Sequence, residues 1–172
     1  MSNEEKRERL NALRQRFSKD ADGVLEAIAA ETEVSTREVY DCLPDTSVDR
    51  RPGEAFEEVM NEVAAWGPVT LLVHTPDVIL ECKGAVPPGK VGRGYFNLMG
   101  PGPVGGHIRH ENCKAIYFVR RKFMGADSCS IVFFNEPGEP MFKIFVGRDE
   151  QRSLLADQVE KFANLQRRLA AS

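Results

Sequence analysis

The stretch VTLLVHTPDVILECKG, residues Val69–Gly84, marks the point where the chain changes from helical to strand patterning. Its two short apolar runs flank Thr75-Pro76, a pair typical of a turn, and the stretch therefore predicts a β-hairpin. His74 ends the first run, at a position where an apolar residue is expected. Periodicity alone favours a structural role for this histidine and leaves a role as a ligand open.

Four helices are predicted before this hairpin. The third begins with a possible capping box of Ser35 and Glu38, and the fourth has Pro52 in its first turn and ends at Gly67-Pro68. Each carries apolar residues at helical spacing, which indicates one buried face per helix. The apolar positions are Leu10, Leu13 and Phe17; Val24, Leu25, Ile28 and Ala29; Val39 and Cys42; and Phe56, Val59, Met60 and Val63.

The chain after the hairpin predicts further strands and one final helix. GYFNLMG, VGGHIRH and CKAIYFVRRKFM read as strands, and SIVFFN-EPGEP-MFKIFVG reads as a second hairpin with a Pro-Gly turn. The helix after Asp149 carries an apolar stripe of Leu155, Val159, Phe162, Leu165 and Leu169. This order predicts an α+β fold with N-terminal helices, a mostly antiparallel sheet of about seven strands and a C-terminal helix. We expect a helical region over residues 1–67 and a β-region with the last helix over 68–172, together one globular domain.

Composition narrows the class of protein. A hydrophobic fraction of 42% and a charged fraction of 28% are ordinary for a soluble domain. No apolar run is long enough to span a membrane, and the charged start of the chain is not a signal peptide. We therefore expect a cytoplasmic protein with no membrane partner. The four scattered cysteines have no zinc-site spacing and are predicted to be reduced and mainly structural.

Charge is unevenly distributed. Eight basic residues and a single acid, Glu111, lie between Lys83 and Lys122 in a chain whose net charge is −3. This excess indicates an anionic partner, although a solvated strand face would give the same pattern. A helix-turn-helix reading of residues 23–44 is disfavoured, because its second helix offers Arg37 beside Glu38 and Asp41, and these acids would oppose DNA phosphates. No nucleic-acid partner is expected.

Two histidines are the candidate ligands. His74 and His107 each lie in a predicted strand near a turn, and a neutral imidazole in an apolar pocket can ligate haem iron. Tyr117 is a further candidate, since a phenolate also binds ferric haem, although a packing role is more common for a strand tyrosine. His107 and His110 are three residues apart in a predicted strand, so their side chains should point to opposite faces. Spacing by itself does not decide between these roles.

Several ordered blocks together resemble a known family. WGPVTLLVHTPDVILE, GYFNL, GGHIRHENC, RKFMG, SIVFFN and MFKIFVGRDE are similar to the intracellular haem utilization carriers of the HutX, ChuX and HugX type, over about residues 44–169. The resemblance implies an α+β fold with a curved antiparallel sheet, a homodimer, and haem b bound as cargo for delivery to a haem-degrading enzyme. It also implies that His74 and His107 occupy haem-binding positions, with Tyr117 as an alternative iron ligand.

Arginines near these positions could pair with the haem propionates. The candidates are Arg93, Arg109, Arg120 and Arg121, and strand alternation favours Arg109 because it shares a face with His107. Two other functions stay open at this point. The protein could cleave bound haem itself, or, with less support, regulate DNA in response to haem or iron.

Overall fold

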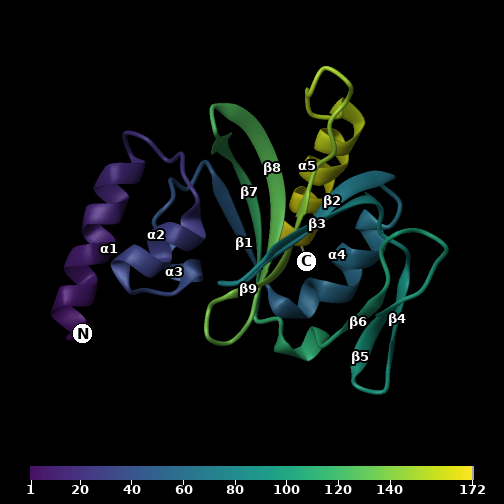
Figure 1. Ribbon diagram of the computed structural model, residues 1–172, viewed down its shortest axis with the longest axis horizontal. Coiled ribbons are helices and arrows are strands. Elements are labelled where there is room, and N and C mark those ends of the chain that lie inside the picture. Colours follow the sequence, from purple (N-terminus) through teal and green to yellow (C-terminus); the bar gives the residue numbers. More distant parts are fainter. Residues whose placement is uncertain (172) are drawn as a thin grey trace.

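A six-stranded antiparallel sheet forms the centre of the protein, with helices on both faces (Figure 1). The computed structural model describes residues 1–171. The strand order is β1-β7-β8-β9-β2-β3, and every neighbouring pair is antiparallel. These strands are β1 (Val48–Pro52), β2 (Pro68–His74), β3 (Ile79–Ala85), β7 (Ala115–Phe123), β8 (Ala126–Phe134) and β9 (Pro140–Phe145).

The helices divide between the two faces of this sheet. Three N-terminal helices, α1 (Asn3–Phe17), α2 (Leu25–Thr32) and α3 (Thr36–Tyr40), cover one face, and α4 (Phe56–Val63) and α5 (Ala156–Ala170) cover the other (Figure 1). A 3-10 turn, η1 (Gly53–Ala55), leads into α4. No helix within residues 1–171 has both the length and the apolarity needed to cross a membrane.

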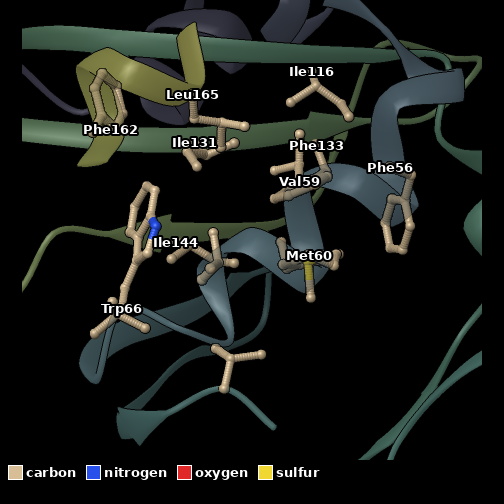
Figure 2. Packing of buried hydrophobic residues seen from close by; sticks show 14 of the residues in the cluster. Phe56, Val59, Met60, Trp66, Ile116, Ile131, Phe133, Ile144, Phe162 and Leu165 are labelled. Atoms are coloured by element: carbon tan, nitrogen blue, oxygen red, sulfur yellow. The ribbon is translucent and has the colours of Figure 1, made fainter. Parts of the chain in front are cut away.

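The six-stranded sheet has a hydrophobic core on each face, and alternate side chains of its strands contribute to one core or the other. On β7, Tyr117 and Val119 join the core under α1–α3, whereas Ile116 and Phe118 join the core under α4 and α5. This follows from the period of two, which sends neighbouring side chains to opposite faces. Figure 2 shows the second core, where Phe56 of α4 packs edge-on against Phe133 of β8, with ring centroids 5.4 Å apart. Burying such aromatic side chains contributes about 1.5–3 kcal/mol each.

A separate three-stranded sheet packs beside α4. It contains β4 (Gly89–Gly92), β5 (Tyr95–Leu98) and β6 (Gly106–Ile108), and β5 is the central strand. Phe96 and Leu98 of β5 belong to the same core as α4 and α5. The alternate residues of β5 and β6 therefore face away from that core.

Most of the predicted elements are confirmed. The α+β order is observed, and the β2–β3 hairpin turns where expected: the Thr75 N–H donates to the Val78 carbonyl at 2.9 Å, and the Thr75 hydroxyl accepts from two backbone N–H groups. The capping box of Ser35 and Glu38 begins α3. All four cysteines are free. The final helix buries Phe162 and other residues of its predicted stripe.

Two local predictions are wrong. Pro52 ends strand β1 and does not lie in the first turn of α4, because residues 48–52 pair with β7, which helical periodicity could not reveal. The predicted antiparallel sheet is observed as a six-stranded sheet, and the described residues also form a smaller three-stranded sheet. His110 lies in a 3-10 turn, η2 (His110–Asn112), so the argument from strand alternation does not apply to it.

The basic residues between Lys83 and Lys122 do not form one continuous surface. Arg120 stacks on Phe162 of α5, with its guanidinium 4.9 Å from the ring centroid, whereas Arg121 on the opposite face bonds to the chain before α2. The excess of charge in the sequence is thus divided between faces. The proposed boundary between residues 67 and 68 stays a prediction, although α4 and the strands share one core.

Candidate functional site

A pocket of about 160 Å³ lies between α2 and the face of the six-stranded sheet. Strands β2, β3, β7, β8 and β9 all contribute side chains to it, and Val24, Glu26 and Tyr40 come from the N-terminal helical region. Its apolar lining includes Leu72 and Phe145, which lie on neighbouring strands. The pocket therefore combines an apolar wall with a few charged groups, as ligand sites generally do.

His74 is placed in this pocket by the β2–β3 hairpin. It is the last residue of β2 and pairs across the hairpin with Ile79. Its side chain is 19% exposed, and its Nδ1 atom lies 3.7 Å from the nearer carboxylate oxygen of Glu26. The imidazole is thus neither fully buried nor free in solvent, and an acidic group faces one of its two ring nitrogens. This geometry is suited to a histidine whose other nitrogen binds a ligand.

Glu26 forms a buried ion pair with Lys143 of β9 beside His74. The Lys143 side chain is 7% exposed, and its ammonium lies 5.7 Å from the centroid of the Tyr40 ring. Burial acts to raise the pKa of Glu26, but the Lys143 ammonium outweighs it and the pKa is lowered. Burial likewise acts to lower the pKa of Lys143, but Tyr40 and Glu26 favour the charged form and the pKa is raised. The pocket therefore contains a fixed pair of opposite charges.

The segment before α2 is tied to the tip of the β7–β8 hairpin. Arg121 donates through Nη1 to the Ala21 carbonyl at 2.9 Å and through Nη2 to the Gly23 carbonyl at 2.7 Å. The Asp22 carboxylate accepts from the backbone N–H of Gly125 at 2.9 Å, and these backbone bonds lower the pKa of Asp22. Because this segment leads directly into α2, these bonds position Glu26 over the sheet.

His107 lies in a different surface cluster, on the three-stranded sheet. It is exposed, and its ring centroid is 5.9 Å from that of Tyr95 on the neighbouring strand β5. The Arg109 guanidinium lies 4.7 Å from the same Tyr95 ring, a cation–π contact. His107 and Arg109 thus share a face, as strand alternation predicts. Arg93 lies in the β4–β5 turn with a φ of 54° and is exposed.

The two histidines do not face one cavity within a single chain. Leu72 and His74 lie on the face of β2 toward α2, whereas Val73 packs on the core that the three-stranded sheet also joins. Because the three-stranded sheet that carries His107 packs on the α4 side, the two side chains lie on opposite sides of the six-stranded sheet. The prediction that both are haem-binding positions is not tested by this arrangement.

Tyr117 lies under the N-terminal helices and not in the pocket. It is 5% exposed, donates its hydroxyl proton to Asp41 at 2.8 Å and packs edge-on against Phe134. Burial and the Asp41 carboxylate raise the pKa of Tyr117 to about 12. Both effects disfavour the phenolate that would bind iron, and the role of Tyr117 as an alternative ligand stays a prediction.

Sequence reasoning missed Glu26, Lys143 and Asn97, a residue of β5 that contacts His107. Lys143 in MFKIF and Glu26 in VLEAI are single charges within apolar segments, and this pattern could have drawn attention to them. Nothing local indicates that the two side chains pair, because 117 residues separate them along the chain. Their pairing depends on the packing of α2 against β9.

The size of the pocket limits how haem could occupy it. About 160 Å³ is below the roughly 300–1,000 Å³ of sites that enclose a drug-sized ligand. Next to it, the β2–β3 hairpin exposes Val78 (43%) and Ile79 (57%), whereas Leu80 pairs with Val73 and points to the other face of the sheet. A porphyrin edge could enter the pocket while the rest of the ring lies over this apolar edge. The site thus fits a partly open arrangement and not a closed cage.

Comparison with known proteins identifies the family. Residues 50–165 match the family model described as haem utilisation ChuX/HutX. The chain belongs to this family. It is 38% identical over 141 residues to the intracellular heme transport protein HutX of Vibrio cholerae serotype O1, covering 81% of this chain and 73% of that protein.

Solved structures of similar proteins agree with the fold. A crystal structure of ChuX is 45% identical, covers 93% of this chain and 99% of its own, and superposes with a TM-score of 0.87. A crystal structure of an Erwinia carotovora protein is 44% identical, covers 91% and 98%, and has a TM-score of 0.89. The α+β architecture and the resemblance to the haem utilization carriers are both confirmed.

Proposed function

We propose that this protein is an intracellular carrier that binds haem b and delivers it to a haem-degrading enzyme. The observation that carries the proposal is His74, a partly exposed imidazole in a pocket bordered by an exposed apolar strand. Family membership supports it, as does the similarity to the intracellular heme transport protein HutX of Vibrio cholerae.

The geometry suits reversible binding. His74 supplies one imidazole for the iron, while Leu72, Ile79 and Phe145 give the ring an apolar surface. A carrier must release its cargo, and a shallow site with one principal ligand lets a receiving protein approach the exposed side of the haem. Lys143 and Arg121 add positive charge to the pocket for a propionate, although both already have protein partners.

We also propose that the protein forms a homodimer through the β3 edge. Strand β3 ends the six-stranded sheet, and no described strand pairs with its outer side. The exposed residue Leu80 lies on this edge and points away from the His74 pocket, and unpaired apolar edges favour pairing with another chain. Sedimentation velocity should show a dimer in the wild-type protein and a monomer in Leu80→Lys. A monomeric wild type at micromolar concentration contradicts the proposal.

Haemin titration tests the carrier function. Wild-type protein should give a saturable Soret band, and His74→Ala should weaken binding and change the spectrum. His107→Ala tests whether the second histidine also ligates iron. His110→Gln is the matched control, because its ring packs near Phe56 with centroids 6.1 Å apart and lies outside the pocket. Absence of stoichiometric binding by the wild-type protein overturns the proposal.

A turnover experiment separates a carrier from a haem-degrading enzyme. The haem complex is incubated with a reductant, oxygen and catalase, and the visible spectrum is followed. A carrier keeps its haem spectrum under these conditions. Formation of a bilin product that persists in the presence of catalase would show that the protein cleaves haem itself.

A further inference from the structure

Asn97 lies directly beside His107 on the exposed face of the three-stranded sheet. It belongs to the central strand β5, where it is paired with His107 of β6 on one side and with Lys90 of β4 on the other. Side chains paired across antiparallel strands share a face. Asn97 Oδ1 is accordingly 2.7 Å from His107 Nδ1, a short hydrogen bond.

The orientation of the Asn97 amide is determined by its other partners. Its Nδ2 atom donates to the carbonyl oxygens of Lys90 at 3.0 Å, Gly92 at 3.1 Å and Tyr95 at 3.3 Å. Backbone carbonyls only accept hydrogen bonds, so the amide nitrogen must face them. A flipped amide would direct its oxygen at three other oxygens and lose all three bonds. The amide oxygen therefore faces His107.

This orientation sets the tautomer of His107. An amide oxygen cannot donate, so His107 Nδ1 must carry the proton of the bond between them. In a neutral imidazole, a proton on Nδ1 leaves the lone pair on Nε2. Among residues 1–171, no hydrogen-bond partner of Nε2 is found, and the His107 side chain is exposed. Histidine in water favours the opposite tautomer, so the preference comes from the protein.

Tyr95 adds to the restraint on the ring. It lies two residues before Asn97 on the same face and contacts the His107 ring edge-on. The Arg109 guanidinium covers the Tyr95 ring, so three side chains form one continuous row. The His107 ring is therefore fixed by a hydrogen bond on one edge and by an aromatic contact.

We propose that Asn97 is a positioning residue that presets His107 as an iron ligand at a surface separate from the His74 pocket, with the proton on Nδ1 and the Nε2 lone pair available to haem. This inference rests on the proposed haem-carrier function. It assigns to the Asn97 oxygen the role that an outer acceptor plays for many metal-binding histidines. The Asn97 nitrogen, by contrast, holds the β4–β5 hairpin.

Two variants separate these two roles. Asn97→Ala removes both the acceptor for His107 and the donor to the hairpin. Asn97→Asp keeps an acceptor for Nδ1–H but cannot donate to the three carbonyls. If Asn97 is purely structural, both variants should change the His107 tautomer alike. If it positions His107, Asn97→Asp should retain the Nδ1–H tautomer and Asn97→Ala should not. Asn61→Ala is the matched control, because Asn61 is exposed on α4 and is not a hydrogen-bond partner of Asn97 or His107.

The first measurement uses apo protein and needs no haem. Long-range proton–nitrogen NMR at a pH where the imidazoles are neutral reports the tautomer of each histidine, and His107→Gln assigns the signal. We expect the Nδ1–H form for His107 in the wild type, Asn97→Asp and Asn61→Ala, and a shift toward the Nε2–H form in Asn97→Ala. An Nε2–H form in the wild type overturns the inference, whatever the protein binds.

The second measurement is a haemin titration in a His74→Ala background, so that His107 is the remaining candidate ligand. Adding Asn97→Ala should weaken binding about tenfold, the lower end of the effect of losing an outer partner of a metal ligand, and should reduce the low-spin share of the spectrum. Unchanged affinity and spectrum overturn the positioning role. Failure of the wild-type protein to bind haemin overturns the proposed function instead, and the apo tautomer still decides the arrangement of Asn97 and His107.

Discussion

Replacing Lys143 with methionine tests the charge balance of the His74 pocket. Methionine keeps the length and apolar stem of the side chain but removes the cation that pairs with Glu26. The Glu26 carboxylate would then lie between α2 and the sheet with a side chain that is only 15% exposed. An unpaired, largely buried carboxylate destabilises the folded protein.

The size of the effect follows from the burial of both partners. Removing one partner of a fully buried pair typically costs about 3–5 kcal/mol. Glu26 borders a pocket that is partly open to solvent, which screens its charge, so we expect Lys143→Met to lower the free energy of unfolding by about 2–3 kcal/mol at pH 7. The double variant Glu26→Gln/Lys143→Met should recover at least half of this loss, because no buried charge is left unpaired.

The expected effect depends on pH with a definite sign. In the wild type the pKa of Glu26 is lowered, so its stabilising contribution is present above the carboxyl's unfolded pKa and is lost as pH falls through the folded pKa. Without Lys143, burial raises the pKa of Glu26, and protonation relieves the unpaired charge as pH falls. The difference in stability between wild type and Lys143→Met should therefore narrow from pH 7 toward pH 4.

Urea unfolding provides the assay. The single tryptophan, Trp66, is 3% exposed and packs near Phe162, so its fluorescence reports on unfolding of the core. Midpoints and slopes are measured for the wild type, both single variants and the double variant at several pH values. The reasoning is refuted if the single losses add in the double variant, or if the loss in Lys143→Met does not change with pH.

Other parts of the structure give three further expectations. Tyr117→Phe should lower the free energy of unfolding by about 1–2 kcal/mol, because Asp41 loses a hydrogen bond, and this difference should shrink as pH rises from 10 through the wild-type pKa of about 12. The same variant should leave haemin titration unchanged, and a changed spectrum would restore Tyr117 as a ligand. Asp22→Ala should speed amide hydrogen exchange at Gly125, whose N–H donates to that carboxylate; unchanged exchange would contradict this hydrogen bond. Phe133→Ala should cost about 3–5 kcal/mol in urea titrations, since the ring is 0% exposed, and a loss below about 1 kcal/mol would contradict the packing.

Local sequence signals predicted the elements that depend on neighbouring residues. The turn at Thr75-Pro76 and the capping box of Ser35 and Glu38 involve atoms a few residues apart, so their chemistry is readable from the sequence. The strand β1 was missed for the opposite reason. Its residues include Asp49 and Arg50, which show no apolar alternation, and only pairing with β7 makes them a strand.

The candidate site also contains some residues that the sequence could indicate and others that it could not. His74 could be singled out as an unusual residue at the end of an apolar strand, and ordered motifs indicated its family. Its acidic neighbour Glu26 could not be foreseen, because helix α2 and strand β2 meet only in the folded chain. The same holds for the Asn97 amide, whose orientation depends on carbonyls of two strands.

By itself, then, the sequence determined the α+β class with its helical start and final helix, the hairpin whose first strand ends in His74, and membership of a haem utilisation family. The tertiary structure alone decided that His74 and His107 lie on opposite sides of the sheet, that Tyr117 is bonded to Asp41, and that Lys143 balances Glu26. The physical reason is the range of the interactions. Periodicity and capping act over a few residues, whereas strand pairing and side-chain burial join segments far apart in the chain.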